Sequence, residues 1–72
     1  MKKVIDLHGI RHKDAKTILE QNLLGYDNPY LNTQIIHGNS PEMRRIVHEF
    51  LDEFDFLYRV DWLNKGQTII VG

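Results

Sequence analysis

The chain has 72 residues, 42% hydrophobic and 26% charged, and this composition is typical of one small globular domain covering residues 1–72. It contains no cysteine, which excludes disulfide bonds, thiolate catalysis and cysteine-ligated zinc. The formal net charge of −1 excludes binding of nucleic acid through bulk positive charge, so any polyanion site must come from local placement of cations. No apolar stretch has the length of a membrane span or the form of a signal peptide. We therefore expect a cytoplasmic domain without a membrane partner.

The first half of the chain predicts a strand, a helix and a second strand. Residues 3–7 alternate in the way a strand requires, with Ile5 and Leu7 on one side. Apolar residues spaced i, i+3, i+4 and i+8 predict an amphipathic helix over about residues 13–24. Residues 33–36 are rich in β-branched side chains and predict the second strand.

The second helix carries the clearest signals. Ser40 offers an N-cap oxygen, and Pro41 occupies the first helical position, where its missing N–H is harmless. A complete apolar stripe follows, formed by Met43, Ile46, Val47, Phe50, Leu51 and Phe54. The first turns carry Arg44 and Arg45 while the end carries acids, an order that opposes the helix dipole. We interpret these arginines either as part of a solvated face or as ligands of an anionic partner.

The last part of the chain predicts a hairpin. Residues 58–62 alternate, residues 68–71 are apolar and β-branched, and Asn64–Gly66 between them suits a tight turn. The resulting order β-α-β-α-β-β predicts a two-layer α/β sandwich with a mixed four-stranded sheet and both helices on one face. The first two strands should be parallel, with right-handed crossovers, and the hairpin should add an antiparallel pair.

Polar side chains follow each of the first two strands where the strand ends, at Asp6–Gly9 and at His37–Ser40. If these strands are neighbours, their carboxyl ends meet at one edge of the sheet. Two helix N-termini, which bind anions through unpaired N–H groups, begin at the same edge. Five of the nine Lys and Arg residues belong to this region of the chain: Arg11, Lys13, Lys16, Arg44 and Arg45. The sequence therefore predicts an anion-binding edge.

The same residues resemble the small MutS-related (Smr) domain family. Asp6–Gly9 (Asp-Leu-His-Gly) and Ile35–Gly38 (Ile-Ile-His-Gly) are similar to the two signature motifs of that family. Arg44 in the following helix and a closing strand at Gly66–Val71 extend the similarity over nearly the whole chain. The resemblance implies a stand-alone minimal Smr domain with a fold similar to the C-terminal domain of translation initiation factor 3. It also implies the strand order 1-2-4-3.

Smr domains are associated with nicking of DNA or cleavage of RNA, so the resemblance implies a nucleic-acid partner and phosphodiester hydrolysis. The catalytic residues would be Asp6, His8 and His37. Mg²⁺ is a candidate cofactor, and a protein partner could deliver the domain to its substrate. From the motifs and the local cations together, we expect nucleic acid to contact Gly9, Arg11, Lys13, Lys16, Gly38, Asn39, Ser40, Arg44 and Arg45.

Two positions differ from the family pattern. The second motif usually continues with a cation and a glycine, and here these are Asn39 and Ser40. A cation near the developing charge of a phosphorane is worth about 10²–10³ in rate. The differences therefore predict weak or absent cleavage with binding retained.

Each functional interpretation has a structural alternative. His8 would transfer protons and Asp6 would orient it or hold a divalent metal; otherwise His8 caps the first helix and Asp6 bonds backbone N–H groups of the turn. His37 either touches a phosphate or only ends its strand. At the level of the whole chain, the alternative is a non-catalytic adaptor that docks proteins on the acidic face of its second helix.

Other polar and aromatic residues have ordinary explanations. His8 and His12 are four residues apart, but the glycine between them argues against a shared helical face and a zinc site. His48 is expected to be solvated. Tyr58 and Trp62 could stack on bases, or they could cover the core and the sheet edge.

Overall fold

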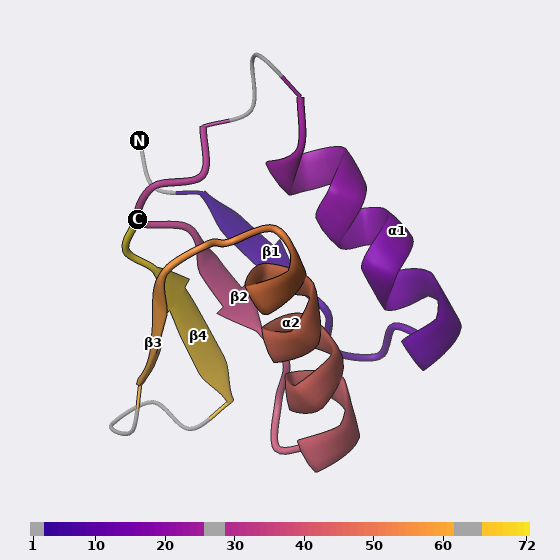
Figure 1. Cartoon of the computed structure of the whole chain (residues 1–72). Coiled ribbons are helices and arrows are strands. Elements are labelled where there is room, and N and C mark those ends of the chain that lie inside the picture. The colour runs from indigo at the N-terminus through magenta and orange to yellow at the C-terminus, as the bar shows by residue number, and fades with distance from the viewer. Residues whose placement is uncertain (1–2, 26–28, 62–65) are drawn as a thin grey trace.

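The computed structural model describes residues 3–25, 29–61 and 66–72 (Figure 1). Its elements follow the predicted order: β1 (Val4–Asp6), α1 (His12–Leu23), β2 (Gln34–Ile36), α2 (Pro41–Glu53), β3 (Tyr58–Asp61) and β4 (Gln67–Ile70). Helix α1 begins and ends one residue earlier than predicted. Trp62 and most of the predicted hairpin turn lie outside the described residues. Among the described residues, no helix has both the length and the hydropathy to cross a lipid bilayer.

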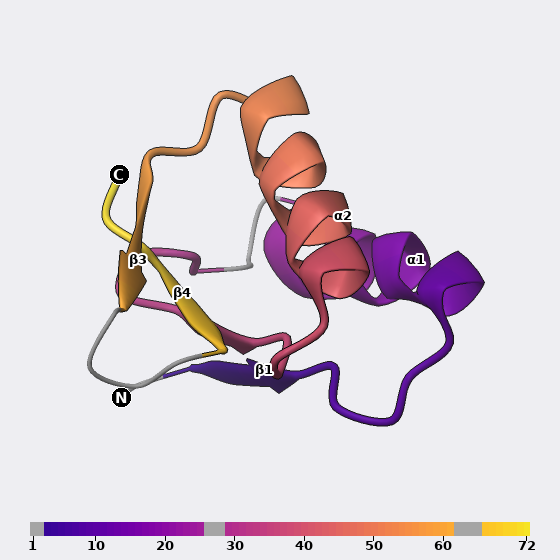
Figure 2. The same cartoon turned by 90° about the horizontal axis from the view of Figure 1, so that it is seen from below.

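The four strands form one mixed sheet in the order β1-β2-β4-β3, as predicted. Strands β1 and β2 are parallel, and β4 pairs antiparallel with both β2 and β3. The register places Thr68 of β4 between Ile35 of β2 and Val60 of β3, in the middle of the sheet. Both helices cover the same face of the sheet, as Figure 2 shows.

The core lies between the sheet and the two helices. Strand alternation sends Ile5 and Leu7 into it, and both side chains are buried as expected. The helices add buried stripes at Ala15, Leu19 and Leu23 and at Met43, Val47, Phe50 and Leu51. Phe54 is 39% exposed because it follows the last residue of α2 and serves as its C-cap.

Tight turns end both parallel strands and position the helices that follow. Gly9 and Gly38 have φ of +79° and +68°, a left-handed conformation that glycine adopts without a Cβ penalty. We call residues 7–10 and 37–40 the strand-end turns. Because each turn reverses the direction of the chain, α1 and α2 both begin at the edge where β1 and β2 end (Figure 1).

Candidate functional site

An open depression of about 460 Å³ lies between the two strand-end turns, and we call it the first depression. Its lining residues are Leu7, His8, Gly9, Ile10, His12, His37, Gly38, Asn39, Ser40 and Met43. A Cβ placed on Gly38 would lie 3.9 Å from Cδ2 of His8, so the two turns are in close proximity. The prediction that His8 and His37 share one edge of the sheet is confirmed.

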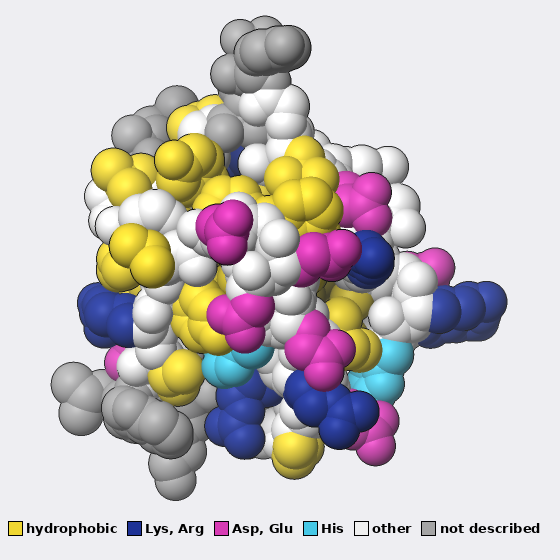
Figure 3. All heavy atoms as spheres, viewed as in Figure 1, with side chains coloured by type: hydrophobic (Ala, Val, Ile, Leu, Met, Phe, Trp, Pro, Cys, Tyr) yellow, Lys and Arg dark blue, Asp and Glu magenta, His cyan; other side chains and the backbone are white. Residues whose placement is uncertain are grey.

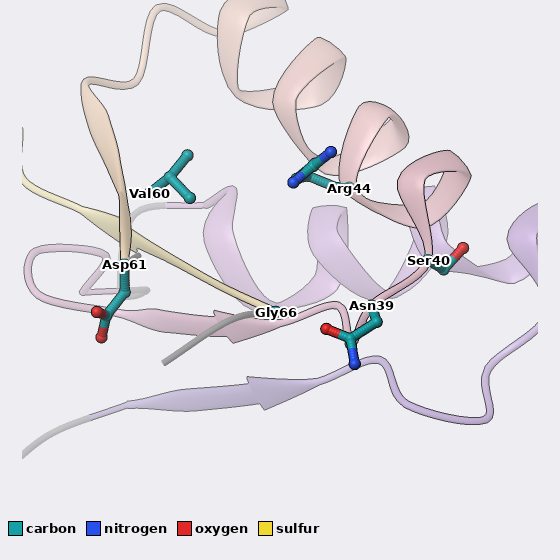
Figure 4. Close-up of a pocket in the computed structure, with 7 residues that line it drawn as sticks. Asn39, Ser40, Arg44, Val60, Asp61 and Gly66 are labelled. Carbon is teal, nitrogen blue, oxygen red and sulfur yellow. The ribbon is translucent and has the colours of Figure 1, made fainter. Parts of the chain in front are cut away.

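A second depression, of about 140 Å³, lies on the other side of the His37–Ser40 turn. Gly38, Asn39, Ser40, Arg44, Val60, Asp61 and Gly66 line it (Figure 4). In Figure 4, the guanidinium of Arg44 extends from α2 toward β3, whereas the carboxylate of Asp61 points to the opposite side of the sheet. Arg44 is therefore the arginine of α2 that lines this depression, whereas Arg45 does not.

The two helices begin differently. Ser40 is the N-cap of α2, as predicted, and its Oγ accepts a hydrogen bond from the backbone N–H of Met43 at 3.2 Å. Helix α1 begins after Arg11, whose side chain makes no capping hydrogen bond. The alternative in which His8 caps α1 is therefore wrong. The first turn of α1 keeps N–H groups that no side chain of the described residues caps.

Asp6 shapes the first turn and does not contact an imidazole ring. Its Oδ1 accepts the backbone N–H of His8 at 2.9 Å. Its side chain is exposed, and the residue lines neither depression. Asp6 therefore bonds a backbone N–H of the turn, as in the structural alternative to a catalytic role. Its carboxylate is not positioned to orient the His8 ring.

His37 is only 3% exposed, and both of its ring nitrogens are engaged. Nδ1 lies 3.0 Å from the carbonyl oxygen of Gly38, and Nε2 lies 2.9 Å from Oγ1 of Thr68. Burial and the nearby charge of Arg44 lower the pKa of His37, against the opposing effect of the Gly38 bond. The ring is therefore neutral at pH 7, and neither nitrogen is free to take a proton from a water molecule.

Sequence reasoning missed His48 and Thr68. His48 is half-buried, its Nε2 lies 2.9 Å from Oγ1 of Thr68, and its ring stacks on Tyr58 at 4.8 Å between centroids. The hydroxyl of Tyr58 donates to Asp52 at 3.0 Å. The prediction that His48 is solvated is wrong, because position 48 lies at the border of the apolar stripe and turns toward β4. With its ring against His48, Tyr58 is engaged within the fold.

The five predicted cations divide into two groups. Arg44 lines the second depression, and Arg11 and Lys13 lie at the beginning of α1 without lining either depression. The other two lie over acids of α2 and line neither depression: Nζ of Lys16 is 3.9 Å from Glu53, and Nε of Arg45 is 3.6 Å from Glu49. In Figure 3, acidic side chains follow the exposed side of α2, and histidine and basic side chains gather below them near its start.

Metal binding needs several ligands at one place, and the described residues do not supply them. Among residues 3–25, 29–61 and 66–72, no group of three or more His, Asp or Glu side chains is close enough to hold an ion. The one carboxylate of the first motif, that of Asp6, already accepts a backbone N–H. The described residues therefore do not fit a Mg²⁺ ion held by the protein alone.

Comparisons of the chain with known protein families, curated proteins and solved structures find no match. The site is thus characterised by its geometry. One edge of the sheet joins an exposed imidazole, a buried neutral imidazole, a helix start without a side-chain cap and the guanidinium of Arg44.

Proposed function

We propose that this chain is an Smr-like domain that binds the phosphodiester backbone of nucleic acid at the edge formed by its strand-end turns. The observation that carries the proposal is the first depression, which joins His8 and the strand-end turns at the starts of α1 and α2. N–H groups at helix starts and charged donors are the groups that bind phosphate oxygens. The strand order β1-β2-β4-β3, which the Smr resemblance implies, supports the proposal at the level of the fold.

We infer that the isolated domain cleaves phosphodiesters weakly or not at all. Hydrolysis requires a base for water, stabilisation of the phosphorane and a proton for the leaving oxygen. His8 is exposed and could supply one of these, but both nitrogens of His37 and one carboxylate oxygen of Asp6 are engaged elsewhere. Asn39 carries no charge, and the Ser40 oxygen caps α2.

The binding proposal is tested by the salt dependence of affinity. With Arg11, Lys13 and Arg44 each contacting one phosphate, the slope of log affinity against log salt should be about −3 on duplex DNA. Arg44→Ala should flatten that slope by about 1, whereas Arg45→Ala should leave it unchanged. Arg45 is a matched control because it neighbours Arg44 on α2 but pairs with Glu49 outside both depressions.

The measurement is fluorescence anisotropy with single-stranded DNA, duplex DNA, branched DNA and an RNA hairpin between about 50 and 200 mM salt. Non-specific dissociation constants of about 10⁻⁴–10⁻⁶ M are expected at physiological salt. Equal slopes for wild type, Arg44→Ala and Arg45→Ala would remove this edge from consideration as the binding site.

Cleavage is tested by a time course on labelled RNA and supercoiled plasmid, with Mg²⁺ and with a chelator. We expect little product from the wild type and more from the double variant Asn39→Lys with Ser40→Gly. His8→Ala controls for contaminating nuclease. Vigorous wild-type cleavage that His8→Ala abolishes would make this domain an enzyme and contradict the inference.

The alternative function is a protein-interaction adaptor, and one observation favours it. Glu49, Asp52 and Glu53 form an exposed acidic face along α2 (Figure 3). A basic partner docked there would lose affinity with Glu49→Lys and keep it with Arg44→Ala. Nucleic-acid binding should show the reverse dependence, so the same pair of variants separates the two functions.

A further inference from the structure

One buried hydroxyl lies between two imidazole rings behind the first depression. Oγ1 of Thr68 is 2.9 Å from Nε2 of His37 and 2.9 Å from Nε2 of His48. Thr68 is 0% exposed, and the centroids of the two rings are 6.0 Å apart. We call these three residues the His-Thr-His chain. It reaches from the wall of the first depression, at His37, to the half-buried ring that stacks on Tyr58.

The positions of the hydrogens in the His-Thr-His chain follow from the groups at its two ends. The carbonyl oxygen of Gly38 only accepts, so Nδ1 of His37 carries a hydrogen. In neutral His37, Nε2 is then an acceptor and receives the hydroxyl hydrogen of Thr68. The Thr68 oxygen must therefore accept from His48, whose Nε2 carries a hydrogen. All donors point in one direction, from His48 through Thr68 and His37 to Gly38.

The His-Thr-His chain can hold one extra proton, which enters at Nδ1 of His48 and can reside on either ring. A proton on Nδ1 of His48 leaves every hydrogen bond in place. Two transfers can follow: the Nε2 hydrogen of His48 moves to Thr68, and the Thr68 hydrogen moves to Nε2 of His37. The positive charge then lies on His37, and His48 is neutral with its hydrogen on Nδ1. A second proton would direct two N–H groups at one oxygen and leave the buried Thr68 hydroxyl without an acceptor. It would also place two cations side by side.

We propose that His37 and His48 share a single proton through the hydroxyl of Thr68, and that an anion bound in the first depression draws this proton onto the pair. The second half rests on the proposed function, since it takes a phosphate as the anion. His37 lines the depression, so a negative charge there stabilises its imidazolium form. Thr68 and His48 are positioning residues in this arrangement, because they act on the depression through His37.

Some of the charged and titratable groups around the two rings lower their pKa values, and others raise them. Burial and then Arg44 of α2 lower the pKa of His37. Burial, His37 and Arg44 lower the pKa of His48, and Asp52 of α2 raises it. Tyr58 of β3 stacks on His48 as a neutral phenol whose pKa is raised by burial. His8 and His12 line the depression that His37 faces from β2. Burial is the largest effect on both rings and keeps the pair neutral at pH 7 without an anion.

The expected pH dependence has a definite sign. The free pair has a lowered pKa, and a bound phosphate raises it. Between these two pKa values, binding takes up one proton, so affinity rises as the pH falls, by at most about tenfold per pH unit. The limit corresponds to one proton, whereas two independently titrating histidines would allow about a hundredfold.

The shared proton is tested on the free domain by NMR, using the ring ¹H, ¹³C and ¹⁵N shifts of both histidines. At neutral pH we expect the hydrogen on Nδ1 of His37 and on Nε2 of His48. On acidification both rings should titrate together, and each should show only part of the full protonation shift. Thr68→Val should uncouple the two titration curves, and Thr68→Ser should retain their coupling. Thr33→Val is the matched control, since Thr33 is equally buried but bonds neither ring.

If Thr68→Val does not fold, His48→Phe replaces it, because the phenyl ring can keep the stacking on Tyr58. His37 should then show the full protonation shift by itself. Two wild-type rings that titrate independently, each with the full protonation shift, would overturn the shared proton.

The link to the anion is tested by isothermal titration of a short oligothymidylate in two buffers of different ionisation enthalpy, across the acidic and neutral pH range. Proton uptake approaching one per bound site in wild type and Thr68→Ser, and a reduced uptake in His48→Phe, would support it. Binding without proton uptake would overturn the link and leave the proposed function intact. An absence of binding at every pH would overturn the proposed function and the link together, while the NMR titration still decides the shared proton.

Discussion

Two glycines in contact hold the second strand-end turn in place. The carbonyl oxygen of Gly66 accepts N–H groups of His37 at 2.8 Å and of Gly38 at 3.1 Å. Gly66 has a φ of +94°, and a Cβ on it would lie 2.9 Å from backbone atoms of Gly38. Since backbone cannot move aside as a flexible side chain does, the residue that precedes β4 determines the shape of the turn that lines both depressions.

Gly66→Ala should therefore lower the free energy of unfolding by about 3 kcal/mol, because left-handed strain and a backbone clash add together. Gly9→Ala is the control: Gly9 has a similar positive φ, but a Cβ placed on it would meet no described atom within 4 Å beyond its chain neighbours. It should cost about 1 kcal/mol. Urea unfolding measures both, and equal losses would contradict the role given to the Gly66–Gly38 contact.

Two buried threonines offer a second comparison of single residues. Oγ1 of Thr33 is buried without a hydrogen-bond partner among the described residues, whereas Oγ1 of Thr68 serves two histidines. Thr33→Val should raise the free energy of unfolding by about 1 kcal/mol, and Thr68→Val should lower it by about 2 kcal/mol. Thermal and urea unfolding provide the test. A loss of stability in Thr33→Val would mean that its hydroxyl has a partner.

At the scale of elements, the two helices differ in how they begin. Ser40 caps α2 through the N–H of Met43, and the proline after it suits the first helical turn. Arg11 occupies the N-cap of α1 without a side-chain hydrogen bond. A cap that satisfies an N–H group stabilises the helix, whereas an uncapped start leaves that group for a ligand.

Ser40→Ala should accordingly destabilise the domain by about 1 kcal/mol, and Arg11→Ser should stabilise it by a similar amount. For Arg11→Ser, the affinity for nucleic acid should change in the opposite direction to the stability. Arg11→Ser removes a cation and occupies an N–H group of α1, so it should weaken phosphodiester binding while the fold gains stability. Tighter binding by Arg11→Ser would contradict the placement of the phosphate at α1.

At the scale of the whole molecule, buried imidazoles make the stability depend on pH. Burial lowers the pKa of His37 and of His48 below the ordinary value of 6.5. The unfolded chain therefore binds more protons than the folded one below that pH. The contribution of these residues to stability is fully present above about pH 6.5 and is lost as the pH falls toward their folded pKa values.

Urea unfolding at about pH 7.5, 6.5 and 5.5 should show the free energy of unfolding falling with pH, by up to about 1.4 kcal/mol per pH unit for each proton. His48→Gln should make this dependence shallower, because it removes one of the two groups with a lowered pKa. Stability that stays level or rises on acidification would show that the two rings are not protected from protonation.

The sequence by itself determined the element order, the parallel pairing of the first two strands, the N-cap at Ser40 and the common edge of His8 and His37. These features follow from side-chain periodicity, from capping chemistry within four residues and from the rule that parallel strands end at one edge.

Tertiary structure alone decided the partners of the individual side chains. His48 is 20 residues from Thr68, and they meet only because β4 lies beside β2 in the sheet whose face α2 covers (Figure 2). Lys16 looked like part of the binding edge until the packing of α1 against α2 set it over Glu53. Register and helix packing fix such contacts through the whole core, and no local pattern in the chain encodes them.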